Sequence, residues 1–288
     1  MLNIQHVTSL DLDELAPYRT LRRPLDHLEK GIFVAEGEKI VRRLVESSLS
    51  VISMLMTPHW YQLLVADLQK FIVQTVTIYI AEKELLETIV GFPLHQGIMA
   101  VARVPEEHLL EDELKLASHP YLLVALDGLV NSENVGVIVR NCAAFGVDGI
   151  LVGETSSSPY MRRAVRNSMG AVFHLPVIRT TDLAERLKNL EDKNGIRVVL
   201  ANPSDGVPLD QADLSGDICL VFGNEGTGIS NRILDMPFLR VSVPMKNDTD
   251  SLNVASASAV ILYKASKEKK PVSRNELSDT KPWISDPL

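Results

Sequence analysis

The sequence predicts an α/β protein whose C-terminal half is a mainly parallel β-sheet with helices on both faces, preceded by a small α/β domain. From Pro120 onward, short apolar runs alternate with segments of helical periodicity. The runs are apolar without interruption, which is typical of strands that are buried on both faces. The length of 288 residues corresponds to about two domains at roughly 150 residues each. We expect a first domain over 1–112, a second over 117–268 and a C-terminal tail over 269–288.

The first domain mixes strand and helix patterns. Apolar and β-branched residues predict strands over 32–35, 51–58, 73–80 and 97–105. Apolar residues that recur at a spacing of three and four predict helices from Glu38 onward and over 60–70. These patterns indicate a compact α/β unit.

The second domain alternates strictly between the two kinds of element. Strands are predicted over 121–129, 148–153, 172–178, 196–203, 218–226 and 239–245. Helices are predicted over 134–146, 158–170, 181–195 and 251–268. The helix over 181–195 has the clearest boundaries, because Thr181 and Asp182 can cap its start and Gly195 can end it. Alternation of this kind predicts a parallel sheet covered on both faces.

Charge and aromatic content argue against nucleic acid as a partner when taken alone. The formal net charge is −8, and aromatic residues make up only 5% of the chain. Few aromatics disfavour a stacking platform for single-stranded RNA. Net charge, however, describes solubility and nonspecific association, whereas binding depends on the local field. Local basic clusters therefore remain informative.

Several classes of protein are disfavoured by what the sequence lacks. No apolar run approaches the roughly 20 residues of a spanning helix, and the N-terminus lacks a basic segment followed by an apolar one. Two cysteines are too few for a disulfide framework or a cysteine-based zinc site. The seven histidines form no ligand-spaced pair. We expect a soluble, reduced, cytoplasmic protein with no metal and no membrane contact.

Three predicted strands of the second domain end in polar segments. The first leads into a helix that carries Asn134 and Arg140, the second into a turn with Gly223, Gly226, Gly228 and Glu225, and the third into a helix opened by Ser251 and Asn253. Open α/β sheets bind ligands outside the carboxyl ends of their strands. We therefore expect these segments to form one site.

Each segment alone also has a structural explanation. Asn134 and Ser251 are ordinary helix caps, Arg140 suits a solvated helix face, and the glycines suit a tight turn. The order G-x-x-G-x-G is wrong for the dinucleotide fingerprint, and no Gly-Lys-Ser/Thr follows for a P-loop. Only the combination of segments is specific.

In combination the segments resemble a known family. N-x-G-x-x-x-R at 134–140, FGNEG at 222–226 and SLNV at 251–254 resemble the SpoU (TrmH-type) branch of the SPOUT RNA methyltransferases, over 121–264. FVAEGEKIVRRLVES in the first domain resembles the substrate-binding α/β domain of many members. The resemblance implies a deep trefoil knot, S-adenosylmethionine bound in a bent conformation within it, and a homodimer with sites at the subunit interface.

The resemblance also implies a reaction, the transfer of a sulfonium methyl group to a ribose 2′-hydroxyl of rRNA or tRNA. Carried over by motif, the catalytic residues are Asn134, Arg140, Glu225, Ser251 and Asn253, and the cofactor-binding residues are Gly223, Asn224, Gly228, Val243 and Leu252. The family assigns its arginine a base-like role. A guanidinium, whose pKa exceeds about 12, is better suited to positioning the ribose and a phosphate. Asn247 departs from the family pattern, in which glycine is frequent, and this puts the shape of the cofactor loop in question.

Two basic clusters are candidates for RNA contact. Arg162, Arg163 and Arg166 share a predicted helix, and Arg22 and Arg23 lie in the first domain. Arginine binds phosphate well, so these residues are expected to contact the RNA backbone; the alternative is a solvated helix face.

Other function classes stay open at this point. A noncatalytic RNA-binding module that retains the SPOUT fold is the main alternative, and the presence of all five polar motif residues argues against it. A nucleotide-binding oxidoreductase is disfavoured by the order of the glycines.

Overall fold

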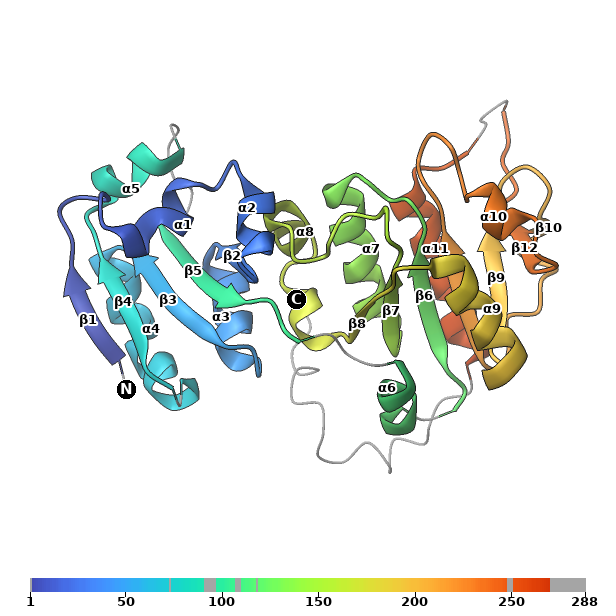
Figure 1. Ribbon diagram of the computed structural model, residues 1–288, viewed down its shortest axis with the longest axis horizontal. Helices are drawn as coiled ribbons and strands as arrows, with labels where there is room; N and C mark the ends of the chain where they lie inside the picture. Colours follow the sequence, from blue (N-terminus) through green and yellow to red (C-terminus); the bar gives the residue numbers. More distant parts are fainter. Residues whose placement is uncertain are drawn as a thin grey trace.

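The computed structural model describes residues 2–72, 74–90, 97–106, 110–117, 119–247 and 251–269. Figure 1 shows two β-sheets side by side along the long axis of the molecule. The N-terminal part (residues 2–106) holds a five-stranded sheet, and the C-terminal part (residues 110–269) holds a seven-stranded sheet. None of the helices in these described ranges is long and apolar enough to cross a membrane.

The sheet of the N-terminal part has the strand order β1-β4-β3-β5-β2. Its strands are β1 (Leu2–His6), β2 (Ile32–Glu36), β3 (Val51–Met56), β4 (Val76–Ile80) and β5 (Ile98–Arg103), accompanied by η1 (Asp13–Leu15), α1 (Ala16–Arg19), α2 (Pro24–Glu29), α3 (Glu38–Glu46), α4 (Pro58–Phe71) and α5 (Lys83–Val90). Strand β5 pairs antiparallel with β2 and β3, whereas β4 pairs parallel with β1 and β3. The four strands and two helices predicted in this part are confirmed; β1, α1, α2 and α5 were not predicted.

The sheet of the C-terminal part has the order β10-β12-β9-β11-β6-β7-β8. Its strands are β6 (Leu122–Leu126), β7 (Gly149–Val152), β8 (Val177–Arg179), β9 (Arg197–Ala201), β10 (Val207–Pro208), β11 (Ile218–Phe222) and β12 (Leu239–Ser242). The helices are α6 (Leu110–Leu116), α7 (Ser132–Ala144), α8 (Arg162–Asn167), η2 (Ala171–His174), α9 (Leu183–Asn194), α10 (Asn231–Leu234) and α11 (Val254–Glu268). Its strand pairs are parallel.

Both faces of this second sheet are covered, as predicted. Side chains alternate along a strand, so Leu122, Val124 and Leu126 of β6 pack in one core with α7, α8 and α11, while Leu123 and Ala125 pack in a second core with α6, α9 and α10. The continuous apolar character of β6 follows from this burial on two sides.

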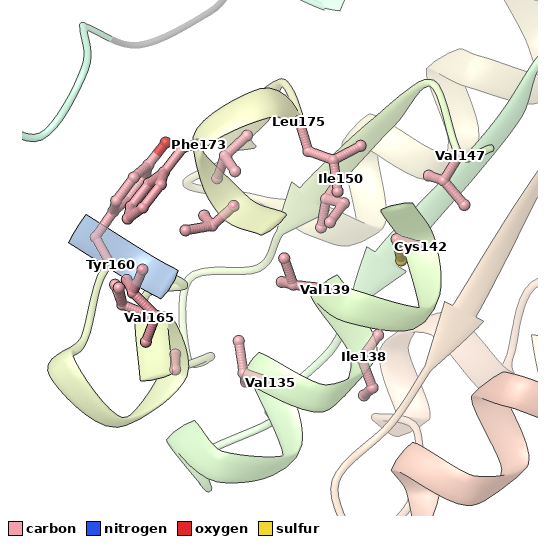
Figure 2. Close-up of a cluster of buried hydrophobic side chains, with 14 of the residues drawn as sticks. Val135, Ile138, Val139, Cys142, Val147, Ile150, Tyr160, Val165, Phe173 and Leu175 are labelled. Atoms are coloured by element: carbon pink, nitrogen blue, oxygen red, sulfur yellow. The ribbon is translucent and has the colours of Figure 1, made fainter. Parts of the chain in front are cut away.

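Helix α7 is held tightly against α8 and the sheet. Figure 2 shows the apolar side chains Val135, Val139 and Cys142 of α7 among the buried side chains of this core. A Cβ added at Gly136 would lie 2.5 Å from the carbonyl oxygen of Ala164, so α7 and α8 cross with their backbones in close approach. The position of α7, which carries Asn134 and Arg140, is therefore fixed by packing.

The two parts of the chain share a packed interface. The Phe33 ring of the N-terminal part lies 5.3 Å from the Tyr160 ring and 5.6 Å from the Phe173 ring, centroid to centroid. The Arg162 guanidinium donates to the Glu36 carboxylate across the same interface, with Nη2 2.7 Å from Oε2. One hydrophobic cluster runs through both parts. The relative orientation of the sheets is therefore set by buried contacts.

Two predictions on this interface are wrong in detail. The helix predicted over 158–170 is shorter, because α8 covers Arg162–Asn167 only, and the first half of the strand predicted over 172–178 is instead the 3₁₀ turn η2. Met169 and Gly170 both adopt left-handed conformations (φ 54° and 78°), which turn the chain before η2. Phe173 then packs on Phe33. The trefoil knot and the domain boundaries stay predictions, and residues 270–288 of the predicted tail lie outside the described residues.

Candidate active site

A cavity of about 700 Å³ opens at the carboxyl ends of β9, β11 and β12. Its walls come from the segments 201–205, 222–229, 240–245 and 251–254, which are far apart in sequence. Eight of the residues predicted to be catalytic or cofactor-binding line it: Gly223, Asn224, Glu225, Gly228, Val243, Ser251, Leu252 and Asn253. Parallel strands bring their carboxyl ends to one edge of the sheet, so the chain forms its site where the topology predicts one.

The glycine turn after β11 is built by close backbone approach. A Cβ added at Gly223 would lie 2.4 Å from the Ile229 nitrogen and 2.5 Å from the Gly228 carbonyl carbon. Gly228 has a φ of 73°, in the left-handed region. Asn224 holds the turn together, since its Oδ1 accepts hydrogen bonds from the backbone nitrogens of Gly226 (2.8 Å) and Thr227 (3.0 Å). The backbone of this turn, which lines the cavity, is thus fixed internally.

A hydrogen-bonded chain of side chains joins three separate segments beside the cavity. Asn253 Nδ2 donates to Asn134 Oδ1 over 3.3 Å, and Asn134 Nδ2 donates to Glu225 Oε1 over 2.7 Å. We name Asn134, Glu225 and Asn253 the amide–carboxylate cluster. The first bond fixes which end of the Asn134 amide is the acceptor, so its nitrogen faces the carboxylate.

Helix caps explain how the cluster is positioned. Asn253 is the N-cap of α11, where its Oδ1 accepts from the Ala255 nitrogen (2.9 Å). Asn131 is the N-cap of α7, where its Oδ1 accepts from the Glu133 nitrogen (2.9 Å). The structural alternative, with Ser251 and Asn134 as the caps, is therefore wrong. Because Asn131 caps α7, the Asn134 side chain is available for the cluster.

Arg140 lies away from the cluster within the chain. It is exposed on α7, and among the described residues no hydrogen bond or ion pair involves its side chain. It follows Asn134 by six positions, which corresponds to about 9 Å along the helix axis and about 120° around it. Arg140 does not line the cavity. Val135 and Val139 occupy the face of α7 that packs on the sheet, so Arg140 lies on the solvated face of the helix.

The arginines predicted to contact RNA lie together in a groove between the two parts of the chain. This groove has a volume of about 1480 Å³, and α1 and α2 form one side of it while α7 and α8 form the other. We name it the arginine groove; its cationic lining residues are Arg19, Arg22, Arg23, Arg162, Arg163 and Arg166. Arg162 differs from the other predicted residues, because its side chain is only 18% exposed and is paired with Glu36.

Some residues near the site were missed by sequence reasoning. The buried Asp127 carboxylate, at the end of β6, accepts from the Ser230 nitrogen (2.7 Å) and ties two strand-end loops together. Arg240 pairs with Asp205 on the wall of the cavity. Asp127 could have been found from the sequence, because it is a carboxylate directly after a predicted buried strand. No sequence signal indicates the contact between Arg240 and Asp205.

Asn247 adopts the backbone conformation that glycine would favour. Its φ is 57°, in the left-handed region, which asparagine tolerates better than other residues with a side chain. The departure from glycine therefore leaves the turn possible at this position.

The described ranges contain no cluster of three or more His, Cys, Asp or Glu side chains suited to a metal. Cys142 and Cys219 are both buried, and burial raises the pKa of both thiols. A buried thiol with a raised pKa is a poor nucleophile and metal ligand.

Comparison with known proteins agrees with this geometry. The model of the SpoU rRNA methylase family matches residues 121–263. A Mycobacterium tuberculosis protein named as an uncharacterized tRNA/rRNA methyltransferase is 32% identical in an alignment of 271 positions that covers 91% of each chain. The structure of the SpoU methyltransferase AviRb from Streptomyces viridochromogenes with AdoMet has a TM-score of 0.74 at 25% identity, over 89% of this chain and 98% of that one. An AdoMet-bound rRNA methyltransferase from Sinorhizobium meliloti shares the fold, with a TM-score of 0.76 at 23% identity, over 92% and 98% of the two chains. The chain belongs to the SpoU family of RNA methyltransferases.

Proposed function

We propose that the protein transfers a methyl group to a ribose 2′-hydroxyl of rRNA or tRNA, with S-adenosylmethionine as the methyl donor. The observation that carries this proposal is the amide–carboxylate cluster, in which Asn134, Glu225 and Asn253 meet at the cavity. A noncatalytic RNA-binding module has no need for such a polar chain beside a cavity.

The cavity suits S-adenosylmethionine in size and lining. Its volume of about 700 Å³ lies within the range of small-ligand pockets, about 300–1,000 Å³. The close approach at Gly223 leaves the turn no room for a side chain, so backbone groups lie on the cavity wall. Gly223, Asn224, Gly228, Val243 and Leu252 would hold the cofactor, which supplies an electrophilic methyl group on its sulfonium sulfur.

The cluster would position the acceptor hydroxyl. Asn134 has a second amide hydrogen, and Glu225 has a second carboxylate oxygen, so the two present one donor and one acceptor beside the cavity. A ribose 2′-hydroxyl would donate a hydrogen bond to the Glu225 carboxylate. This bond would align the hydroxyl oxygen for attack on the methyl group, and the carboxylate would draw the hydroxyl proton away from that oxygen. Ser251 lines the same cavity and adds a hydroxyl that bonds the acceptor or the cofactor.

Arg140 would bind the ribose or an adjacent phosphate. A guanidinium keeps its protons at neutral pH and forms paired hydrogen bonds with phosphate oxygens. Its exposed place on α7, outside the cavity lining of its own chain, favours a role at a site shared between two copies.

The partner that would share this site is a second copy of the chain. Val260 and Tyr263 of α11 are 42% and 55% exposed, and Tyr263 contacts Phe145 at the end of α7. This apolar surface lies on the same helix pair as Arg140. A homodimer through α7 and α11 would cover it and bring Arg140 of each chain toward the cavity of the partner.

Replacing Arg140 tests the proposal. We expect Arg140→Ala to lower methyl incorporation into RNA by about 100-fold or more, the size of a lost catalytic interaction, while calorimetry shows unchanged binding of S-adenosylmethionine. Arg140→Lys keeps the charge but not the fork geometry, so it should restore little activity. A fully active alanine variant would refute the role of Arg140. Binding of NAD in place of S-adenosylmethionine would favour an oxidoreductase instead.

A further inference from the structure

Among the described residues that line the arginine groove, one side chain is acidic. Arg19, Arg22 and Arg23 lie on the side of the N-terminal part, and Arg163 and Arg166 lie on the opposite side. Glu133, in the first turn of α7, is the only carboxylate among the described residues that line the groove. A concentration of arginines of this kind, on a chain with a net charge of −8, creates a local positive field.

We propose that the arginine groove binds the phosphate backbone of the RNA substrate, and that Glu133 occupies the place of one phosphate on Arg163 until the RNA displaces it. The nature of the ligand, an RNA, rests on the proposed function. The groove and the ion pair between Glu133 and Arg163 are features of the structure itself.

The ion pair between Glu133 and Arg163 is exposed, so another anion can replace the Glu133 carboxylate on Arg163. Arg163 Nη1 lies 3.4 Å from Glu133 Oε1, and the two side chains are 72% and 55% exposed. Exposed pairs of this kind are weak, because water competes with them and both side chains lose freedom. A phosphate offers Arg163 a stronger, bidentate partner. RNA binding therefore replaces one anion on Arg163 with another.

The neighbouring pair between Arg162 and Glu36 behaves differently. Its side chains are only 18% and 17% exposed, and Arg162 Nη2 lies 2.7 Å from Glu36 Oε2. Removing either partner would leave a shielded charge without its partner, so this pair stays closed and holds the two parts of the chain in position. Arg162 thus shapes the groove, and the exposed arginines are the ones that meet phosphate.

The arginine groove and the amide–carboxylate cluster meet at the first turn of α7, where Glu133 lines the groove and Asn134 belongs to the cluster. The two side chains point about 100° apart around the helix axis, so a phosphate on Arg163 and the acceptor at Asn134 would lie on neighbouring faces of the same helix turn. Seven residues separate Glu133 from Arg140, which places both on one face of the helix.

Glu133 also has a structural role, and this role affects the thermal midpoint of unfolding rather than the affinity for RNA. A carboxylate in the first turn of a helix interacts favourably with the helix dipole. Glu133→Gln is therefore expected to lower the thermal midpoint slightly. If Glu133 and RNA compete for Arg163, the same variant should bind RNA more tightly even though its thermal midpoint is lower.

Fluorescence anisotropy with a fluorescein-labelled RNA stem-loop, titrated at several KCl concentrations, tests the proposal. We expect Glu133→Gln to tighten binding by about two- to fivefold, the range of an exposed ion pair. Arg163→Gln should weaken binding and lower the slope of log affinity against log salt by about one. In the double variant the gain from Glu133→Gln should disappear, because the competition no longer exists.

Glu111→Gln is the matched control. Glu111 also lies in the first turn of a helix and pairs with an arginine, Arg186, but outside the groove. This variant makes the same change in net charge and should leave RNA affinity unchanged. An equal gain in Glu111→Gln, or a gain from Glu133→Gln that persists without Arg163, would show that overall charge is responsible and would overturn the exchange.

The outcomes separate this proposal from the proposed function. If Arg163→Gln binds RNA normally while methyl transfer proceeds, the groove assignment is wrong and the methyltransferase assignment stands. If the variants change RNA affinity as expected but the wild type methylates no RNA, the groove stands and the proposed function fails. Preferential binding of polyglutamate over RNA would assign the groove to an acidic protein and overturn the proposal.

Discussion

The glycine turn after β11 gives the sharpest test of how the fold makes the cofactor site. Replacing Gly223 with alanine adds one methyl group 2.4 Å from the Ile229 nitrogen and 2.5 Å from the Gly228 carbonyl carbon. Ordinary contacts lie near 3.5 Å, so the backbone of the turn must move by about 1 Å. The cost of such overpacking is about 1–3 kcal/mol. If it falls wholly on the bound state, the Kd for S-adenosylmethionine rises by about 5- to 150-fold.

Gly226→Ala is the control in the same turn. A Cβ there would have Asn224 Oδ1 as its nearest neighbour, at 3.6 Å, and the position needs no left-handed backbone. Calorimetry with S-adenosylmethionine should show weakened binding for Gly223→Ala and near-normal binding for Gly226→Ala. Equal affinities in the two variants would refute the idea that backbone packing at Gly223 shapes the cavity.

Three further predictions concern stability and reactivity. Asn247→Val places a β-branched residue at a φ of 57°, so it should cost about 1–2 kcal/mol and lower the thermal midpoint, whereas Asn247→Gly should not; equal midpoints would contradict this. Burial lowers the pKa of His27, so its ring is neutral in the folded protein and gains a proton more readily on unfolding. Stability should therefore fall as the pH drops below about 6.5, the ordinary value for histidine, and His27→Gln should reduce this dependence; a pH profile identical to that of the wild type would exclude His27 as its source. Cys142 and Cys219 are buried and have raised thiol pKa values, so a maleimide should label them only after denaturant unfolds the chain; rapid labelling of the native protein would contradict their burial.

Sequence patterns predicted the elements whose signals are local. Helix α9 begins after its cap, Asp182, and ends at Gly195 in a left-handed conformation, as its capping residues indicated. The parallel sheet followed from apolar runs that are buried on both faces, as in β6. Where several neighbours had similar propensity, the prediction failed. Ser251 and Asn253 are both residue types that suit an N-cap. In the structure Asn253 caps α11, and the same side chain also donates to Asn134.

Contacts between distant segments were out of reach of sequence patterns. Glu36 and Arg162 are 126 residues apart, and nothing near either residue indicates the other. Strand β1 was missed because it lies at the edge of its sheet with mostly exposed side chains, so it lacks the apolar run of a buried strand. The motifs predicted that Asn134, Glu225 and Asn253 would share a site, whereas the order of their hydrogen bonds needed the structure.

Nucleoside analysis of RNA after reaction with labelled S-adenosylmethionine tests the central claim most directly. RNA from cells that lack this protein is incubated with the purified chain, digested to nucleosides and separated by mass spectrometry. We predict that the label appears in a 2′-O-methylnucleoside and that it is lost with Arg140→Ala. Label on a base, or no transfer to RNA by a chain that binds the cofactor, would contradict the proposed chemistry.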